Sequence, residues 1–114
     1  MVGIEELMNE MQMQTQQLQS TMAQKQSLMV QSHEVEKALE YLENVNDEKI
    51  YKSIGPMIIE TTKDISKKEL EETKEDMELR VKTLDSQEEK LKEKLKETQE
   101  KLQQMAGQQD KQAS

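Results

Sequence analysis

The chain has no cysteine, phenylalanine or tryptophan, and only one proline, three glycines and two tyrosines among its 114 residues. Without cysteine it forms no disulfides, thiolate metal sites or thiol nucleophiles, which is compatible with a reducing compartment. The scarcity of aromatic residues removes the side chains that usually anchor a core. Because 35% of the residues are charged and 32% hydrophobic, we expect stability to come from helix seams and from other chains.

Several partners and locations are excluded by the same composition. The formal net charge is −8, whereas nucleic acids and anionic membrane surfaces attract clustered lysines and arginines. No apolar run approaches the roughly 20 residues that span a bilayer, and the first ten residues, MVGIEELMNE, lack the basic start of a signal peptide. We therefore expect a cytoplasmic protein that binds neither nucleic acid nor membrane.

Catalytic and cofactor motifs are also missing. His33 is the only histidine and lies beside Glu34 and Glu36 without a second metal ligand nearby in the sequence. The acidic run ELEETKEDMEL lacks the glycine and spacing of a calcium loop, and no glycine lies in a phosphate-binding pattern. The sequence thus predicts no enzyme, no catalytic residues, no metal site and no cofactor.

The first long segment carries apolar residues at the alternating spacing of a coiled-coil seam. No glycine or proline interrupts it, so we predict a helix over 4–44. Its middle is diluted by polar residues. The seam positions are Ile4, Leu7, Met11, Gln14, Leu18, Thr21, Lys25, Leu28, Ser32, Val35, Leu39 and Leu42.

The second long segment repeats the pattern and predicts a helix over 66–106. Ser66 followed by Glu69 has the spacing of a capping box, and Gly107 is typical of a helix end. The polar tail over 107–114 is predicted to be disordered. The seam positions are Leu70, Lys74, Met77, Val81, Leu84, Glu88, Leu91, Leu95, Thr98, Leu102 and Met105.

The stretch between them, over 49–62, alternates in the manner of two strands joined by a turn at Gly55-Pro56. The expected fold is therefore mainly α: a single domain over 1–114 in which two helices pair antiparallel as a coiled-coil hairpin around a central β-hairpin. A continuous parallel dimer is the competing structure. Because two strands alone are marginal in water, the hairpin either packs on its own helices or, as we prefer, joins hairpins of neighbouring subunits in a shared sheet or barrel.

The order of these segments resembles the beta-type subunit of prefoldin. The resemblance covers about Ile4 to Met105, includes the acidic turn Asn46, Asp47 and Glu48, and is most specific at Tyr51, Lys52 and Gly55. It implies a hexamer of two alpha-type and four beta-type subunits built on a double β-barrel. We assign subunit assembly to the hairpin residues Ile50, Tyr51, Ile54, Gly55, Met57, Ile58 and Ile59.

The function implied by the resemblance is that of an ATP-independent holdase, which captures non-native polypeptides at the coiled-coil tips and passes them to a group II chaperonin. Methionine suits such tips because its flexible, polarizable side chain repacks at low cost. A scaffold or tether that never touches unfolded clients is the alternative. The tip residues expected to bind clients are Ile4, Leu7, Met8, Met11, Met13, Leu102 and Met105.

Overall fold

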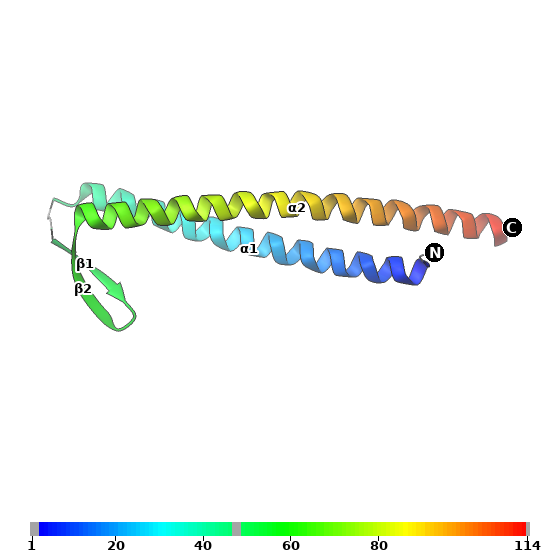
Figure 1. Ribbon diagram of the computed structural model, residues 1–114, viewed down its shortest axis with the longest axis horizontal. Coiled ribbons are helices and arrows are strands. Elements are labelled where there is room, and N and C mark those ends of the chain that lie inside the picture. Colours follow the sequence, from blue (N-terminus) through cyan, green and yellow to red (C-terminus); the bar gives the residue numbers. More distant parts are fainter. Residues whose placement is uncertain (1–2, 47–48, 114) are drawn as a thin grey trace. The chain divides into compact units, whose positions relative to one another are not determined.

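The structure is a computed structural model that describes residues 3–46 and 49–113, with side-chain environments up to Gly107. Within these residues two long helices flank two strands (Figure 1): α1 (Ile4–Asn44), β1 (Lys49–Ile54), β2 (Met57–Thr62) and α2 (Lys63–Ala113). The predicted mainly α fold with a central β-hairpin is confirmed. Asp47 and Glu48 of the expected acidic turn lie outside the described residues.

Helix α1 has the predicted bounds. Its first backbone hydrogen bond runs from the Leu7 N–H to the Gly3 carbonyl, at 3.1 Å. Glu5 and Glu6 lie in the first turn, where negative charge is favourable beside the unpaired N–H groups. At the other end the Val45 N–H donates to the Leu42 carbonyl at 3.3 Å, so the helix closes with a tighter turn.

Helix α2 begins earlier than predicted. The Ile65 N–H donates to the Thr62 hydroxyl at 3.2 Å, which makes Thr62, the last residue of β2, the N-cap. Ser66 therefore lies inside the helix, and the Glu69 carboxylate bonds to Lys52 instead of closing a capping box. The expected cap was wrong because the strand itself ends on a residue that can cap.

Helix α2 also continues past the predicted end at residue 106. Its backbone is helical to Ala113, which covers most of the segment over 107–114 that was predicted to be a disordered tail. A single glycine costs a helix only about 1 kcal/mol relative to alanine, and the glutamines after Gly107 are good helix formers. Gly107 therefore lies within the helix and does not end it.

The structure gives the register of the hairpin, which the sequence left open. Ile54 pairs with Met57 across the turn, Lys52 with Ile59 and Ile50 with Thr61. Gly55 has a φ of 56°, a region in which glycine has no steric penalty, and the ring of Pro56 holds the second turn residue at negative φ. The two-residue turn predicted at Gly55-Pro56 is thus confirmed, and its residues fit the backbone angles that it requires.

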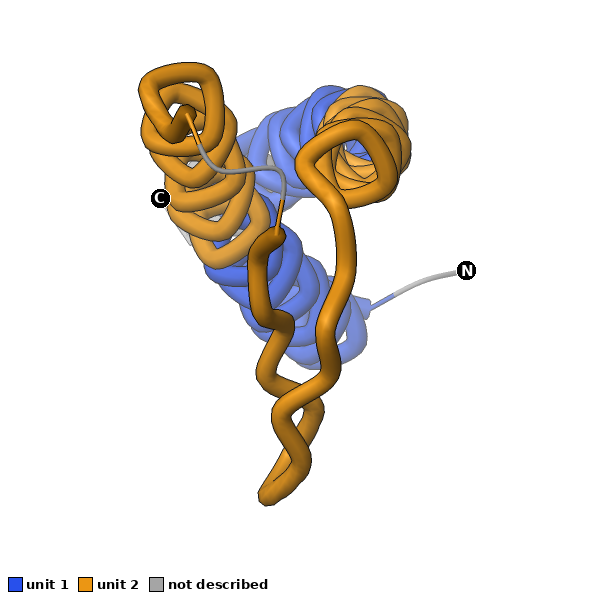
Figure 2. Tube along the Cα trace, turned by 90° about the vertical axis from the view of Figure 1, so that its left-hand side faces the viewer, with its two compact units in different colours: residues 1–25, 83–114 blue, residues 26–82 orange. Residues whose placement is uncertain are grey.

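The chain divides into two compact units (Figure 2), Met1–Lys25 with Thr83–Ser114 and Gln26–Lys82. We call them unit 1 and unit 2. Unit 1 contains the start of α1 and the end of α2, which lie beside each other around residues 17–24 and 87–94. No tight globular core is present among the described residues, because none of their larger side chains is fully buried.

Unit 2 contains the end of α1, the hairpin and the start of α2. Ion pairs join Glu36 Oε1 to Lys74 Nζ at 3.3 Å and Glu43 Oε1 to Lys67 Nζ at 3.1 Å. As the α1 residue number rises the α2 number falls, so the helices of this unit are antiparallel. The Lys63 ammonium also donates to the carbonyls of Glu43 and Val45, at 3.3 and 3.1 Å, and so ties the two helix ends at the hairpin.

The predicted seam positions are confirmed in both units. Each of those positions is buried or half-buried, on α1 from Ile4 to Leu42 and on α2 from Leu70 to Met105. Among the residues with a described side chain, Leu7 and Leu42 are the buried apolar ones, while Gln14, Thr21, Glu88 and Thr98 are buried and polar. A narrow seam stabilises two helices through side-chain packing of one stripe only, which leaves the rest of each helix in water.

Candidate functional site

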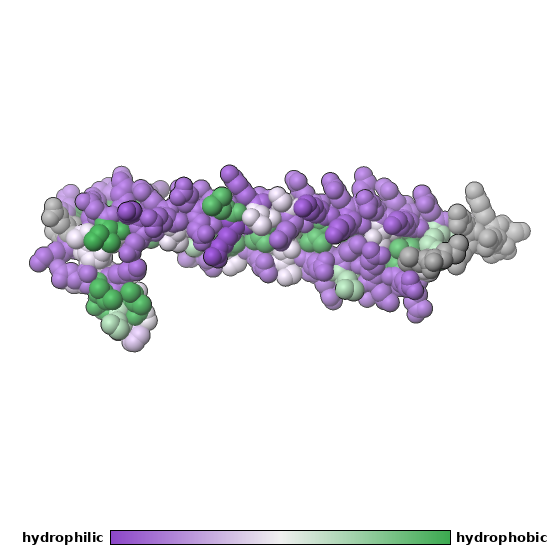
Figure 3. Space-filling view, viewed as in Figure 1, coloured by the Kyte–Doolittle hydropathy of each residue, from purple (hydrophilic) through white to green (hydrophobic). Residues whose placement is uncertain are grey.

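The hairpin exposes most of its apolar side chains. Ile58 is 74% exposed and Met57 61%, and Tyr51, Ile54 and Ile59 are exposed as well. Ile50 is half-buried. Figure 3 shows this hydrophobic surface gathered on the hairpin. A sheet of two strands has two edges with unpaired backbone groups. Among the residues that the structure describes, no third strand pairs with these edges, and most of the apolar side chains of the hairpin are exposed.

The residues assigned to assembly lie on both faces of the hairpin. From the register, Ile54, Met57 and Ile59 share one face, and Tyr51 and Ile58 the other. A side-chain bond from Lys52 Nζ to Glu69 Oε2, 2.8 Å long, links this hairpin to α2. The alternative in which the hairpin buries its apolar surface on its own helices is not what is found, because that surface is exposed.

The expected client-binding residues lie where α1 begins and α2 ends, within unit 1. They differ in accessibility. Leu7 is 3% exposed, whereas Met8 is 54% and Met13 62% exposed. Ile4, Met11, Leu102 and Met105 are half-buried. Five of these side chains are therefore buried or half-buried in the seam, whereas Met8 and Met13 are exposed and available to a partner.

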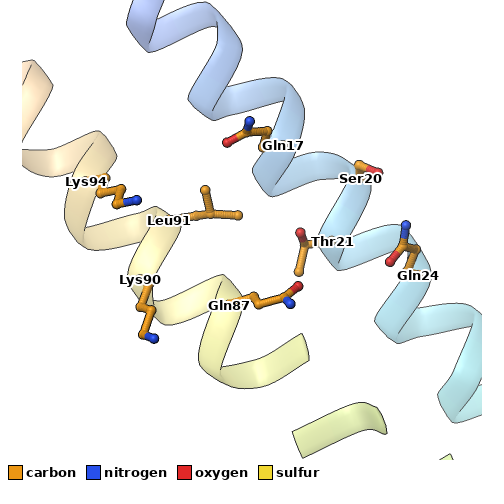
Figure 4. Close-up of a pocket in the computed structure, with 8 residues that line it drawn as sticks. All are labelled: Gln17, Ser20, Thr21, Gln24, Gln87, Lys90, Leu91 and Lys94. Carbon is orange, nitrogen blue, oxygen red and sulfur yellow. The ribbon is translucent and has the colours of Figure 1, made fainter. Parts of the chain in front are cut away.

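A shallow hollow of about 430 Å³ lies further along unit 1 (Figure 4). Leu91 of α2 and Thr21 of α1 point toward each other across it, with Gln17 and Lys94 nearby. Threonine at a seam position is smaller than leucine, so the seam is underfilled here. The hollow offers amide, hydroxyl and ammonium groups and has no arrangement suited to catalysis.

An ion-pair cluster crosses the same unit. Lys25 Nζ contacts Asp85 Oδ1, and it donates to Glu88 Oε2 at 3.1 Å; the other oxygen of Glu88 lies 3.3 Å from Lys92 Nζ. Hydrogen bonds from Asp85 and Glu88 raise the pKa of Lys25, and those from Lys25 and Lys92 lower the pKa of Glu88. The sequence identified Lys25 and Glu88 as polar seam positions but did not predict that they form an ion pair. An antiparallel alignment of the two seams could have revealed this contact.

His33 is 66% exposed on its side chain and its Nδ1 lies 3.8 Å from Glu36. Among residues 3–46 and 49–113, no group of three or more metal-binding side chains occurs. In the same part of the chain, neither helix is long and apolar enough to cross a membrane.

A family model and several known proteins match this chain over most of its length. A family model described as prefoldin subunit matches residues 5–109. The prefoldin subunit beta of Archaeoglobus fulgidus is 40% identical over 101 residues, which cover 88% of this chain and 87% of the relative. That of Pyrobaculum neutrophilum is 44% identical over 92 residues, covering 80% of this chain and 73% of the relative.

Solved structures agree with these sequence matches. The crystal structure of the prefoldin beta subunit from Thermococcus strain KS-1 is 37% identical to this chain, covers 90% of both chains and superposes with a TM-score of 0.82. The beta2 subunit from the same strain, at 22% identity and a TM-score of 0.69, shares the fold. The family model, the relatives and the shared fold together show that the chain belongs to the prefoldin subunit family, a family of chaperones that are not enzymes.

Proposed function

We propose that the chain is a beta-type prefoldin subunit that acts as an ATP-independent holdase in the cytoplasm. It captures non-native polypeptides with the residues at the start of α1 and the end of α2 and transfers them to a group II chaperonin. The observation that carries the proposal is the exposure of Met8 and Met13 beside a seam that buries Leu7. Flexible methionines at an exposed helix end suit a partner without a fixed shape.

The hairpin supplies assembly in this proposal. Its apolar side chains and open edges join those of an alpha-type subunit and of further beta-type copies, in a hexamer of two alpha-type and four beta-type subunits. Burial of one isoleucine side chain is worth about 1.5–3 kcal/mol, so a shared sheet that covers Ile54, Ile58 and Ile59 supplies a strong driving force. Association would also satisfy the unpaired edge groups.

In such an assembly, weak binding at each subunit is sufficient to hold an unfolded client. Several linked sites that bind one unfolded chain act at a high effective concentration, so the assembly binds that chain more tightly than a single site does. Binding to the unfolded chain delays aggregation by mass action alone. No nucleotide hydrolysis is required for this step.

The test is suppression of aggregation without ATP. An unfolded, aggregation-prone protein is diluted into buffer that contains the chain assembled with an alpha-type partner, and light scattering is followed. We expect wild type to suppress scattering and the variant Met8→Ser with Met13→Ser to lose most of that effect. A matched control, Gln12→Ser with Gln16→Ser, changes neighbouring exposed positions of α1 and should behave as wild type.

Assembly of each variant is first verified by light scattering coupled to size exclusion. If assembled wild type leaves aggregation unchanged, the holdase function is wrong and the scaffold alternative is favoured. If wild type suppresses aggregation and the methionine variant does so equally well, the holdase function stands but the client site lies elsewhere.

A further inference from the structure

The two exposed methionines at the start of α1 each follow a glutamate by about one helical turn. Glu5 lies three residues before Met8, and Glu10 lies three residues before Met13. Side chains at this spacing are neighbours on a helix surface, with about 5–6 Å between their Cβ atoms. All four side chains are exposed. Each of these methionines therefore has a carboxylate beside it that faces water.

These carboxylates have no cationic partner among the described residues. Residues 3–24 contain no lysine, arginine or histidine. In the part of the chain that the structure describes, none of the ion pairs involves Glu5, Glu6 or Glu10. Glu10 Oε1 accepts a 3.4 Å bond from the neutral amide of Gln14. The negative charges at the start of α1 are therefore uncompensated.

The facing stretch of α2 adds no net charge. Thr21 of α1 and Leu91 of α2 point toward each other across the hollow in unit 1 (Figure 4). Because both helices rise equally per residue, this antiparallel alignment brings the turns with the glutamates opposite about 99–107 of α2. The charged side chains of that stretch are Glu100 and Lys101, one of each sign. The surface around the two methionines is thus acidic on balance.

The apolar surface of the hairpin differs in this respect. Lys49 Nζ lies 3.9 Å from Glu60 Oε1, and Lys52 Nζ lies 2.8 Å from Glu69 Oε2. Charges beside that surface are matched within the chain, whereas those beside the two methionines are left for a partner.

Lysine and arginine fit such a surface better than other side chains do. Each has a stem of methylene groups that packs on apolar surface and a charged head that stays in water. A stem laid along a methionine brings its ammonium or guanidinium group close to the carboxylate one turn away. The same carboxylates repel acidic segments, and they also repel a second copy of this chain, whose formal net charge is −8.

We propose that the pairs Glu5 with Met8 and Glu10 with Met13 select client segments in which lysine or arginine flanks apolar residues. This inference rests on the proposed holdase function and names the class of client that its site prefers. The methionines supply an adaptable apolar contact. The glutamates supply the discrimination, because complementary charge contributes to specificity more than to affinity.

The test compares two fluorescent peptides that share one apolar core, the first flanked by lysines and the second by glutamates. Fluorescence anisotropy measures their binding to the full chain assembled with an alpha-type partner. In low salt we expect the lysine peptide to bind about tenfold more tightly, through two exposed ion pairs gained and two repulsions avoided. The difference should shrink as salt approaches about 1 M, where charges are screened beyond about 3 Å.

Two charge variants locate the effect. Glu5→Gln with Glu10→Gln keeps the size of both side chains and should lose most of the preference for the lysine peptide. Glu72→Gln with Glu75→Gln changes the net charge equally, at exposed positions of unit 2, and should keep the preference. Circular dichroism and size exclusion verify the fold and assembly of each. The comparison of the two peptides on wild type tests the proposal without either variant.

Several outcomes would overturn the proposal. They are equal binding or no binding of the two peptides by wild type, an unchanged preference in Glu5→Gln with Glu10→Gln, and a lost preference in the unit 2 control. Equally tight binding of a lysine peptide with a serine core would do the same, because charge alone would then suffice. Any of these in an assembly that suppresses aggregation leaves the holdase function intact. An assembly that neither suppresses aggregation nor binds the peptides contradicts both.

Discussion

The hairpin and the start of α1 both expose apolar side chains, but of different kinds. The hairpin presents mostly isoleucines, whose branched side chains are restricted to few rotamers, on a strand pair fixed by backbone hydrogen bonds. The start of α1 presents Met8 and Met13, which have three rotatable bonds and a polarizable sulfur. Stiff side chains on a fixed frame favour one partner of matching shape, and flexible side chains favour many. One chain thus carries two apolar surfaces suited to different tasks.

The largest effect should come from introducing charged side chains on the apolar surface of the hairpin. Ile54→Asp with Ile59→Asp places two carboxylates on one face of the hairpin. We expect association with an alpha-type partner to weaken at least about a hundredfold, since two buried isoleucines contribute several kcal/mol. Ser53→Asp, on the opposite face, is the control for the effect of aspartate on strand formation. Size exclusion with light scattering measures assembly, and unaffected assembly of the double variant would contradict the assigned role of this face.

Next in size is the contrast between neighbours at the start of α1. Leu7→Ala removes a buried seam side chain and should lower the free energy of unfolding by about 2 kcal/mol or more, as for leucines in other cores. Met8→Ala removes an exposed side chain and should change stability by less than about 0.5 kcal/mol. Urea unfolding followed by circular dichroism measures both. Equal losses would mean that Met8 is a seam residue and not an available contact.

A smaller effect is expected where the hairpin joins α2. Thr62→Ala removes the hydroxyl that accepts the Ile65 N–H and should cost about 1 kcal/mol of stability. The control is Thr73→Ala, because that hydroxyl donates to the Glu69 carbonyl inside the helix and caps nothing. Thermal unfolding of the two variants separates the cap from a general effect of threonine. If Thr73→Ala costs as much, the cap is not the cause.

The smallest effect concerns pH and the ion-pair cluster of Lys25, Asp85, Glu88 and Lys92. Because the folded state lowers the pKa of Glu88, its contribution is present above the ordinary glutamate pKa and is lost as pH falls through the lower, folded value. As the pH falls below about 4.3, the ordinary pKa of glutamate, wild type should therefore lose more stability than the variant Glu88→Gln. Lys25 behaves in the opposite sense: its raised pKa means that its contribution is lost only at strongly alkaline pH. Urea unfolding as a function of pH measures both, with Glu97→Gln as an exposed control.

Much of the fold was predictable because it depends on local periodicity. The alternating spacing predicted both seams, and the absence of glycine and proline predicted the bounds of α1. Gly55 and Pro56 predicted the turn, whereas the register was left open and the pairing of Ile54 with Met57 comes from the structure. The ends of α2 were not predicted, because Thr62 competes with Ser66 as a cap and because one glycine is too small a penalty to end a helix. The client and assembly residues remain predictions.

The sequence by itself determined which side chains lie on each stripe, since helical and strand periods follow from backbone geometry alone. It also determined that the hairpin is apolar and that the start of α1 is rich in methionine. Only the tertiary structure decided which residues of the two helices meet: that Lys25 pairs with Asp85 and Glu88, that Glu69 holds Lys52, and that Met8 is exposed while Leu7 is buried. These facts depend on contacts between residues far apart in the chain, which the local period of a helix or strand does not specify.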